Sequence, residues 1–228
     1  MRINRFIADS GYCSRRQADA LISAGKVTIN GRRADLGATV NPQDKIVVEG
    51  KRIKQRTQAY TYILLYKPRG ITCTTDRRRK DNIIDYLGYP KRLFHVGRLD
   101  RDSEGLIILT DDGSIVNRIL RVAENKEKEY EVTVDRDITV DFLKRLEQGV
   151  PILNTITKPC KTKQIDTRRF RIILTQGLNR QIRRMCEYCR YNVEQLKRVR
   201  IMHISCGSMK PGDWRYLTAK EIAELNKK

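Results

Sequence analysis

Hydrophobic and polar positions in the first part of the chain predict a helix. Residues Ser14–Gln17 have the pattern of an N-terminal capping box. Ala18, Leu21 and Ile22 then recur at helical spacing, so one face of the segment is apolar. Together these signals predict a helix over 15–24.

Two short apolar runs, 26–29 and 45–48, predict a β hairpin after this helix, with a tight turn at Asn30-Gly31. Helix and hairpin together predict a small α/β domain over 1–50. Nearly every residue of 51–60 is polar, as in an interdomain linker, so a second domain is expected to follow it.

Longer apolar runs begin at Thr61 and predict a second domain over 61–228. We expect strands over 62–66, 105–110, 128–134, 169–174 and 196–201. We expect helices over 82–87, 112–120, 139–148, 179–189 and 218–226, the last with a capping box from Thr218 to Glu221. Strands and helices do not alternate regularly, which predicts the α+β class: a mixed, largely antiparallel sheet flanked by helices.

Charge points to a polyanionic partner. The chain has 47 Lys and Arg against 27 Asp and Glu, a formal net charge of +20, and nucleic acid is the commonest polyanion. A membrane surface is the weaker alternative, because the basic residues are scattered and no basic amphipathic helix has a bulky aromatic face.

Six cysteines raise the questions of disulfides and metal. The first residues lack the apolar stretch of a secretory signal and no apolar run reaches transmembrane length, so we expect a cytoplasmic protein with reduced thiols. Cys186 and Cys189 have the spacing of a metal knuckle. No second pair follows, and both fall in a predicted helix, so structural cysteines and no metal site are expected.

One carboxylate, Asp100, stands between two arginines just after a glycine turn. Opposite charges about 4 Å apart interact by roughly 4 kcal/mol at an effective dielectric near 20, so Arg98 and Arg101 would keep Asp100 ionised. An ionised, oriented carboxylate can act as a nucleophile or a base. Taken alone, the string is better explained as a surface turn with an incidental ion pair, so other parts of the chain must support a catalytic role.

A second basic segment, 176–185, follows the predicted strand 169–174. It contains a glycine turn, Asn179 as a predicted helix cap, and the three arginines 180, 183 and 184. Backbone N–H groups at the start of a helix, together with arginines, can bind a phosphate or a carboxylate. The alternative interpretation of this segment is a solvent-exposed basic helix without a ligand. Arg15 and Arg16 also occupy a first helical turn, where the macrodipole disfavours cations, so an external anion such as phosphate explains them better.

Two sets of residues resemble known families. Gly11–Arg16 and Gly25–Gly31 resemble the S4 RNA-binding domain. The other set resembles the RNA pseudouridine synthases of the branch that modifies ribosomal RNA, whose members also carry an N-terminal S4 domain. It comprises 67–70, 97–100 with 103–106, 128–130 and 177–185.

The resemblance implies a role for four residues. Asp100 would be the nucleophile and Tyr130 the aromatic partner of the base, with a part in proton handling. Arg183 would pair with Asp100, which leaves Arg98 and Arg101 to face RNA, and Ile182 would pack at the site. The target uridine must flip out of its stack to be reached. Attack at the sugar and attack at the base ring stay open.

The resemblance also implies the substrate. Large-subunit (23S) ribosomal RNA comes first, with small-subunit RNA and a transfer RNA anticodon loop as alternatives, and a monomer without cofactor or metal is expected. RNA contacts are expected at Arg98, Leu99, Arg101, Asn179, Arg180, Gln181, Arg184, Arg15, Arg16, Lys26, Arg77 and Arg78.

Two other functions compete with an RNA-modifying enzyme. A non-catalytic, S4-type ribosome assembly factor would explain the charge, but it gives no reason for a carboxylate amid arginines on an RNA-facing surface. A metal-dependent nuclease could use Asp76, Asp81, Asp111 and Asp112, although 111–113 is more simply a turn and a helix start.

Overall fold

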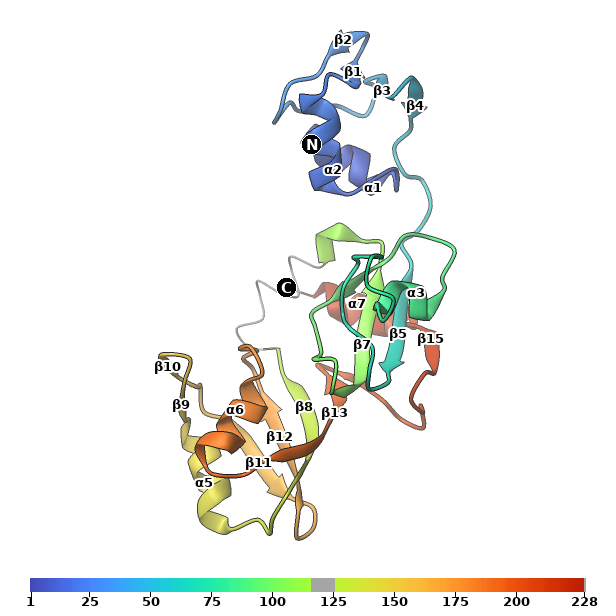
Figure 1. Ribbon diagram of the computed structural model, residues 1–228. Helices are drawn as coiled ribbons and strands as arrows, with labels where there is room; N and C mark the ends of the chain where they lie inside the picture. The colour runs from blue at the N-terminus through green and yellow to red at the C-terminus, as the bar shows by residue number, and fades with distance from the viewer. Residues whose placement is uncertain (116–125, 228) are drawn as a thin grey trace. The chain divides into compact units, whose positions relative to one another are not determined.

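The structure is a computed structural model that describes residues 1–115 and 126–227 (Figure 1). The chain forms two compact units. One comprises Met1–Tyr60 with Asp111–Gly113, and the other comprises Thr61–Thr110 with the described residues from Ser114 onward. No helix in the described ranges is both long and apolar enough to cross a membrane.

Two helices pack on a four-stranded antiparallel sheet in the N-terminal unit. The predicted capping box is confirmed, because Gln17 N donates to Ser14 Oγ (3.1 Å) and Ser14 N donates to Gln17 Oε1 (2.9 Å). Ala18 and Ile22 lie in the core, as their spacing predicts. The elements are α1 (Ile3–Asp9), α2 (Arg15–Ser23), β1 (Val27–Ile29), β2 (Arg32–Arg33), β3 (Ile46–Val48) and β4 (Lys51–Ile53), with strand order β2-β1-β3-β4.

Strand β4 lies inside the segment that the sequence predicts as linker. Lys51 and Arg52 are exposed and only Ile53 is half-buried, so the strand carries almost no hydrophobic signal. It forms because its backbone pairs with β3, with Val47 opposite Arg52. An edge strand of this kind depends on a partner and not on its own composition.

A nine-stranded mixed sheet forms the second unit. Its order is β11-β12-β8-β13-β7-β5-β15, with β14 paired to β13 and β6 to β7. Every pair is antiparallel except β13 with β7, so the predicted mixed, largely antiparallel sheet of an α+β protein is confirmed. The strands are β5 (Tyr62–Lys67), β6 (Phe94–Val96), β7 (Glu104–Thr110), β8 (Lys128–Val134), β11 (Lys161–Gln164), β12 (Arg169–Leu174), β13 (Val193–Ile201), β14 (Ile204–Ser205) and β15 (Trp214–Tyr216).

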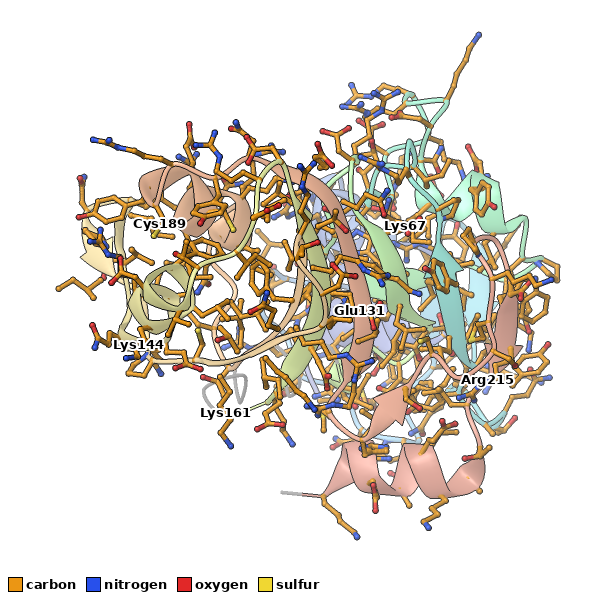
Figure 2. All side chains as sticks on the ribbon, turned by 90° about the horizontal axis from the view of Figure 1, so that it is seen from below. Lys67, Glu131, Lys144, Lys161, Cys189 and Arg215 are labelled. Atoms are coloured by element: carbon orange, nitrogen blue, oxygen red, sulfur yellow. The ribbon has the colours of Figure 1, made fainter. Side chains whose placement is uncertain are left out.

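Within the described residues, this sheet is flanked by α3 (Ile83–Leu87), α5 (Val140–Gln148), α6 (Gln181–Tyr188) and α7 (Ala219–Asn226). The helices α5 and α6 pack with β8, β12 and β13, near a small hairpin of β9 (Pro151–Ile152) and β10 (Thr155–Ile156). In Figure 2, α3 (green) lies on one side of β5 and β7 and α7 (red) lies on the other. Strand β5 is therefore buried on both faces.

Most predicted elements of the second unit are confirmed. All five predicted strands form, although β13 begins at Val193 and not at 196. The capping box of α7 is present at Thr218 and Glu221. The predicted cap at Asn179 is wrong: α6 begins one residue later, with Arg180 as its N-cap. The predicted helix 112–120 falls mostly outside the described residues.

Candidate active site

Asp100 lies in the loop between β6 and β7, and its backbone is fixed on both sides. Gly97 makes the turn at φ 76°. Leu99 is buried, and its N–H donates to Cys73 Sγ at 3.4 Å. Ser103 N donates to Asp100 O at 3.1 Å and leads into β7. The side chain of Asp100 stays 32% exposed, so a rigid support presents a carboxylate that is open to solvent.

Arg198 of β13 lies beneath this loop. Its side chain is buried, its Nε donates to Leu106 O at 2.7 Å, and its Nη1 donates to Arg98 O at 3.3 Å. Gly105 allows the approach of β13 to β7, since a Cβ at this position would lie 2.3 Å from Arg198 O. The guanidinium therefore connects the loop to the one parallel strand pair of the sheet.

Lys67 supports the same loop from the end of β5. Its side chain is fully buried, and its Nζ donates to Pro68 O and Ile71 O, each at 2.8 Å, and to Arg101 O at 3.5 Å. Burial lowers the pKa of Lys67 to about 8. Figure 2 labels Lys67 among the side chains around β5 and β7.

Two further arginines bind the carbonyl of Asp102. Arg69 Nε donates to it at 3.2 Å and Arg183 Nη2 at 3.3 Å. Arg183 Nη1 also donates to Val193 O at 2.9 Å, and burial lowers the pKa of Arg183. Basic groups thus bind the loop carbonyls on both sides of Asp100, and the carboxylate is left to other partners.

The ion pair of Asp100 differs from the predicted one. Arg180 Nη1 lies 3.9 Å from Asp100 Oδ2, whereas the guanidinium of Arg183 is engaged by backbone carbonyls. Arg180 is the N-cap of α6 and has a left-handed φ of 51°, which non-glycine residues adopt at a cost of about 1–3 kcal/mol. Arg101, predicted to flank Asp100, is paired with Asp81 at 3.2 Å.

Three buried polar atoms near the loop have no hydrogen-bond partner within the described part of the chain: Ser103 Oγ, Arg183 Nε and Arg198 Nη2. A buried polar group without a partner costs about 1–3 kcal/mol. All three belong to residues of the loop or to residues that bind it. Unsatisfied groups therefore gather where the candidate chemistry lies, which is common at functional sites.

Tyr130 and Ile182 lie in different environments. Tyr130 lies on β8 opposite Ile172 and Arg198, and is half-buried between the core under α6 and the core under α3. Ile182 is buried in the core under α6. Tyr130 is thus only partly buried, whereas Ile182 serves packing.

The residues predicted to contact RNA fall into two groups. Gln181 and Leu99 are buried, and Gln181 Oε1 accepts from Leu178 N at 3.0 Å, so these two side chains face the protein interior. The exposed ones are Arg98, Arg101, Asn179, Arg180, Arg77, Arg78, Arg15, Arg16 and Lys26, and Arg184 is half-buried.

Several of the exposed arginines and lysines already have carboxylate partners. Arg78 binds Asp76 and Lys26 binds Glu49, each in an exposed ion pair. Exposed pairs are worth about 0–1 kcal/mol, so a phosphate can displace them at little cost. Arg77 pairs with Asp85 in the same way at 3.4 Å.

No group of three or more side chains of metal-ligand type occurs in residues 1–115 and 126–227. All six cysteines are free thiols. Cys186 is buried in α6, and burial raises its pKa, whereas Cys189 is the C-cap of the same helix. These positions fit a packing role for both.

The sequence interpretation assigned no role to Lys67, Arg69 or Arg198. Lys67 ends an apolar strand, and Arg198 lies within the alternating run of β13. A charged residue inside an apolar strand pattern is a usable signal, because burial of a charge requires a specific partner. The identity of that partner is not readable from the sequence.

Comparisons with known proteins agree on the family. A model of the RNA pseudouridylate synthase family matches residues 61–188, and a model of the S4 domain matches residues 1–46. Dual-specificity RNA pseudouridine synthase RluF of Escherichia coli (strain K12) is 49% identical over 228 residues, which cover 100% of this chain and 79% of that protein. Ribosomal large subunit pseudouridine synthase B of Bacillus subtilis (strain 168) is 34% identical over 233 residues, covering 98% and 95%.

A crystal structure of a pseudouridylate synthase has the same fold. It superposes with a TM-score of 0.71 at 30% identity and covers 99% of both chains. The family matches, the identity over the full chain and the shared fold lead to one assignment: this chain belongs to the RNA pseudouridylate synthase family and carries an S4 domain.

Proposed function

We propose that this protein converts a uridine of ribosomal RNA to pseudouridine, with Asp100 as the nucleophile. The observation that carries this proposal is the open carboxylate of Asp100 on a loop whose carbonyls are bound by buried or half-buried cations. A fixed backbone holds the carboxylate in one position, which is what a nucleophile requires.

The reaction balances within the substrate. The N1–C1′ bond of uridine breaks, the base turns, and a C5–C1′ bond forms while C5 loses its proton and N1 gains one. Pseudouridine is an isomer of uridine, so no oxidant, reductant or energy source is needed and we expect no cofactor. Asp100 would attack C1′ of the sugar or C6 of the base ring.

Base flipping brings the uridine to Asp100. Extrusion costs a few kcal/mol, and stacking on Tyr130 would return roughly 1–3 kcal/mol. Arg180, the ion-pair partner in the structure, would orient the carboxylate of Asp100, while Arg183 holds the loop and adds positive potential. Ile182 would pack beneath the site.

Large-subunit ribosomal RNA is the proposed substrate, and a transfer RNA anticodon loop is the second candidate. One relative is named for the large ribosomal subunit, which supports the first choice. We assign the S4 part to 1–50, the linker to 51–60 and the catalytic part to 61–228. The protein would act as a monomer in the cytoplasm, where ribosomal RNA is made.

Tritium release tests the chemistry. RNA with tritium at C5 of uridine should lose tritium to water with the native protein, because the C5 proton leaves. The Asp100→Asn variant should bind RNA with unchanged affinity and release none. Activity that survives this substitution would remove Asp100 from the mechanism, and no release by the native protein on any RNA would favour the non-catalytic assembly factor.

Arginine variants test the assignment of the ion pair. Arg180→Ala should lower the single-turnover rate several-fold, since a half-exposed ion pair is worth about 1 kcal/mol. Arg145→Ala of α5 is the control, because Arg145 pairs with Asp141 and is not among the expected RNA contacts. An unchanged rate in Arg180→Ala would return the pairing role to Arg183. Carbodiimide mapping of the modified RNA would then identify the uridine.

A further inference from the structure

Four aromatic side chains gather at the β15 edge of the large sheet: Tyr86, Tyr89, Trp214 and Tyr216, called here the edge aromatic cluster. The ring of Tyr89 meets Trp214 and Tyr216 edge to face, with centroids 6.2 and 6.5 Å apart, and Trp214 and Tyr216 are 5.6 Å apart. Tyr86, Trp214 and Tyr216 are 42%, 43% and 55% exposed. Much of this aromatic surface therefore faces solvent, where such a patch commonly marks a binding site.

The cluster lies on the same face of the sheet as the Asp100 loop. Trp214 pairs with Leu65 and Tyr216 pairs with Ile63, and directly opposed residues of antiparallel strands share a face. Leu65 and Ile63 belong to the core under α3, and that core also contains Leu99, the neighbour of Asp100.

The residue between the two aromatics faces the other way. Arg215 binds Glu221 of α7 on the opposite face, and Figure 2 labels Arg215 on that side. Strand β15 follows β7 and β5 in the sheet order, and strands are about 4.8 Å apart, so the cluster lies about two strand spacings from β7. Figure 1 shows β15 (red) beside β5.

Specific contacts hold the rings in place. The hydroxyls of Tyr89 and Tyr216 are 3.2 Å apart. Gly212, with φ 97°, permits the approach of Tyr86, because a Cβ there would lie 2.9 Å from the Tyr86 hydroxyl. A surface ordered before binding loses little entropy when a ligand stacks on it.

Basic residues outnumber acidic ones in the segments that flank the cluster. Lys91 and Arg92 follow Tyr89 after Pro90 and are exposed, and the exposed Lys210 precedes β15, where Asp213 is the neighbouring carboxylate. The chain as a whole carries a formal charge of +20. Lysines are depleted at the centres of protein interfaces, whereas aromatic rings amid cations are the usual surface for single-stranded nucleic acid.

We propose that the edge aromatic cluster is a stacking surface for unpaired RNA nucleotides that flank the target uridine. The proposal rests on the proposed function for the nature of the polymer. It extends that function, because recognition would then depend on bases next to the flipped one. Base stacking is tolerant of sequence, so the cluster would select unpaired structure and not a particular base.

The fluorescence of Trp214 offers a direct test, because it is the only tryptophan of the chain. Titration with a single-stranded uridine oligonucleotide should quench it saturably. Inorganic polyphosphate, which has charge but no bases, should compete for binding without quenching. Equal quenching of Trp214 fluorescence by the oligonucleotide and by polyphosphate would overturn the proposal, and so would the absence of quenching at a saturating oligonucleotide concentration.

Variants give the kinetic test on the full-length protein. Tyr216→Ala and Trp214→Ala should each raise KM for a stem-loop RNA about tenfold, with kcat within twofold of the native value. Trp214→Phe keeps an aromatic ring, so its KM for the stem-loop RNA should stay close to that of the native protein. Tyr188→Ala is the matched control, because Tyr188 is also 55% exposed but belongs to α6. Thermal melting of each variant checks that it folds.

The outcomes separate the two proposals. Absence of tritium release by the native protein contradicts the proposed function, and Trp214 quenching still tests the cluster. Normal release with unchanged KM in Tyr216→Ala and Trp214→Ala contradicts the cluster alone. A dimer that dissociates in Trp214→Ala, with unchanged RNA affinity, would assign the cluster to protein association and overturn the proposal.

Discussion

Around Asp100, basic side chains donate hydrogen bonds to backbone carbonyl oxygens and do not form ion pairs through these contacts. Lys67, Arg183 and Arg198 each donate to carbonyls of the loop. A carbonyl accepts a charge-assisted hydrogen bond without neutralising the cation, so the loop is held while the local potential stays positive. Such a potential suits both an ionised aspartate and an RNA phosphate.

Gly105→Ala should destabilise the protein by about 3 kcal/mol or more. Gly105 has a φ of 108°, and its Cβ would meet Arg198 O at 2.3 Å, in the pair of strands that supports the Asp100 loop. Urea denaturation measures the change. Gly177→Ala is the control, because nothing lies within 4 Å of its Cβ position, and it should change stability by less than about 0.5 kcal/mol.

Lys67 should make stability rise with pH in the alkaline range. Its pKa in the folded protein is about 8, below the ordinary 10.5, so between these values the unfolded chain binds a proton that the folded protein has lost. The free energy of unfolding should therefore rise by about 2 kcal/mol from pH 8 to pH 10, at 1.36 kcal/mol per pKa unit, relative to Lys67→Met. Parallel slopes in the two proteins would contradict a depressed pKa.

Among the elements, helix α7 shows how one carboxylate can serve two functions. Glu221 completes the capping box of α7 by accepting from Thr218 N at 2.8 Å. It also accepts from Arg215 of β15, with Nη1 at 2.8 Å and Nη2 at 2.6 Å. Helix α7 and the edge strand that carries the aromatic cluster are thus joined through one side chain.

Glu221→Gln should cost stability at neutral pH and less in acid. Arg215 lowers the pKa of Glu221 to about 2, so the carboxylate stabilises the fold above pH 4.5 and loses this effect as pH falls toward 2. The difference in unfolding free energy between native and variant should shrink by about 2 kcal/mol from pH 7 to pH 3. Urea titrations at both pH values measure it, and a pH-independent difference would contradict this coupling.

The elements also show what local patterns can predict. The capping boxes at Ser14 and Thr218 were predictable, because both partners lie within one helical turn. Strands β4 and β15 were not, since each is three residues long and forms only against β3 or β5. The sequence interpretation assigned the ion pair of Asp100 to Arg183. In the structure Arg180, three residues earlier, lies 3.9 Å from Asp100, a difference within one helical turn that spacing alone does not resolve.

At the scale of the whole molecule, the charge of +20 determines how binding responds to salt. If basic side chains bind about six phosphates, the slope of log K for RNA binding against log salt concentration should be near −4. This value follows from about 0.7 per phosphate contact for single strands. A slope near zero would contradict an electrostatic contribution. Filter binding of a stem-loop RNA at several salt concentrations provides the measurement.

The N-terminal unit should account for part of this slope. Arg15 and Arg16 are exposed in the first turn of α2, so replacing both by Gln should reduce the slope by about 1.4. Arg145→Gln is the control, because Arg145 pairs with Asp141 within α5 and is not among the expected RNA contacts. A slope that is equal in all three proteins would remove these two arginines from the RNA-binding surface.

The sequence by itself determined the fold class, the long strands and the two capping boxes, because these depend on periodicity and short-range patterns, and its resemblance to a family made Asp100 the candidate nucleophile. Only the tertiary structure decided that Arg180 pairs with Asp100, that Lys67 and Arg198 are buried beneath the loop, and that Trp214 and Tyr216 share its face. These relations join residues far apart in the chain. They depend on strand register and side-chain packing, which no local pattern contains.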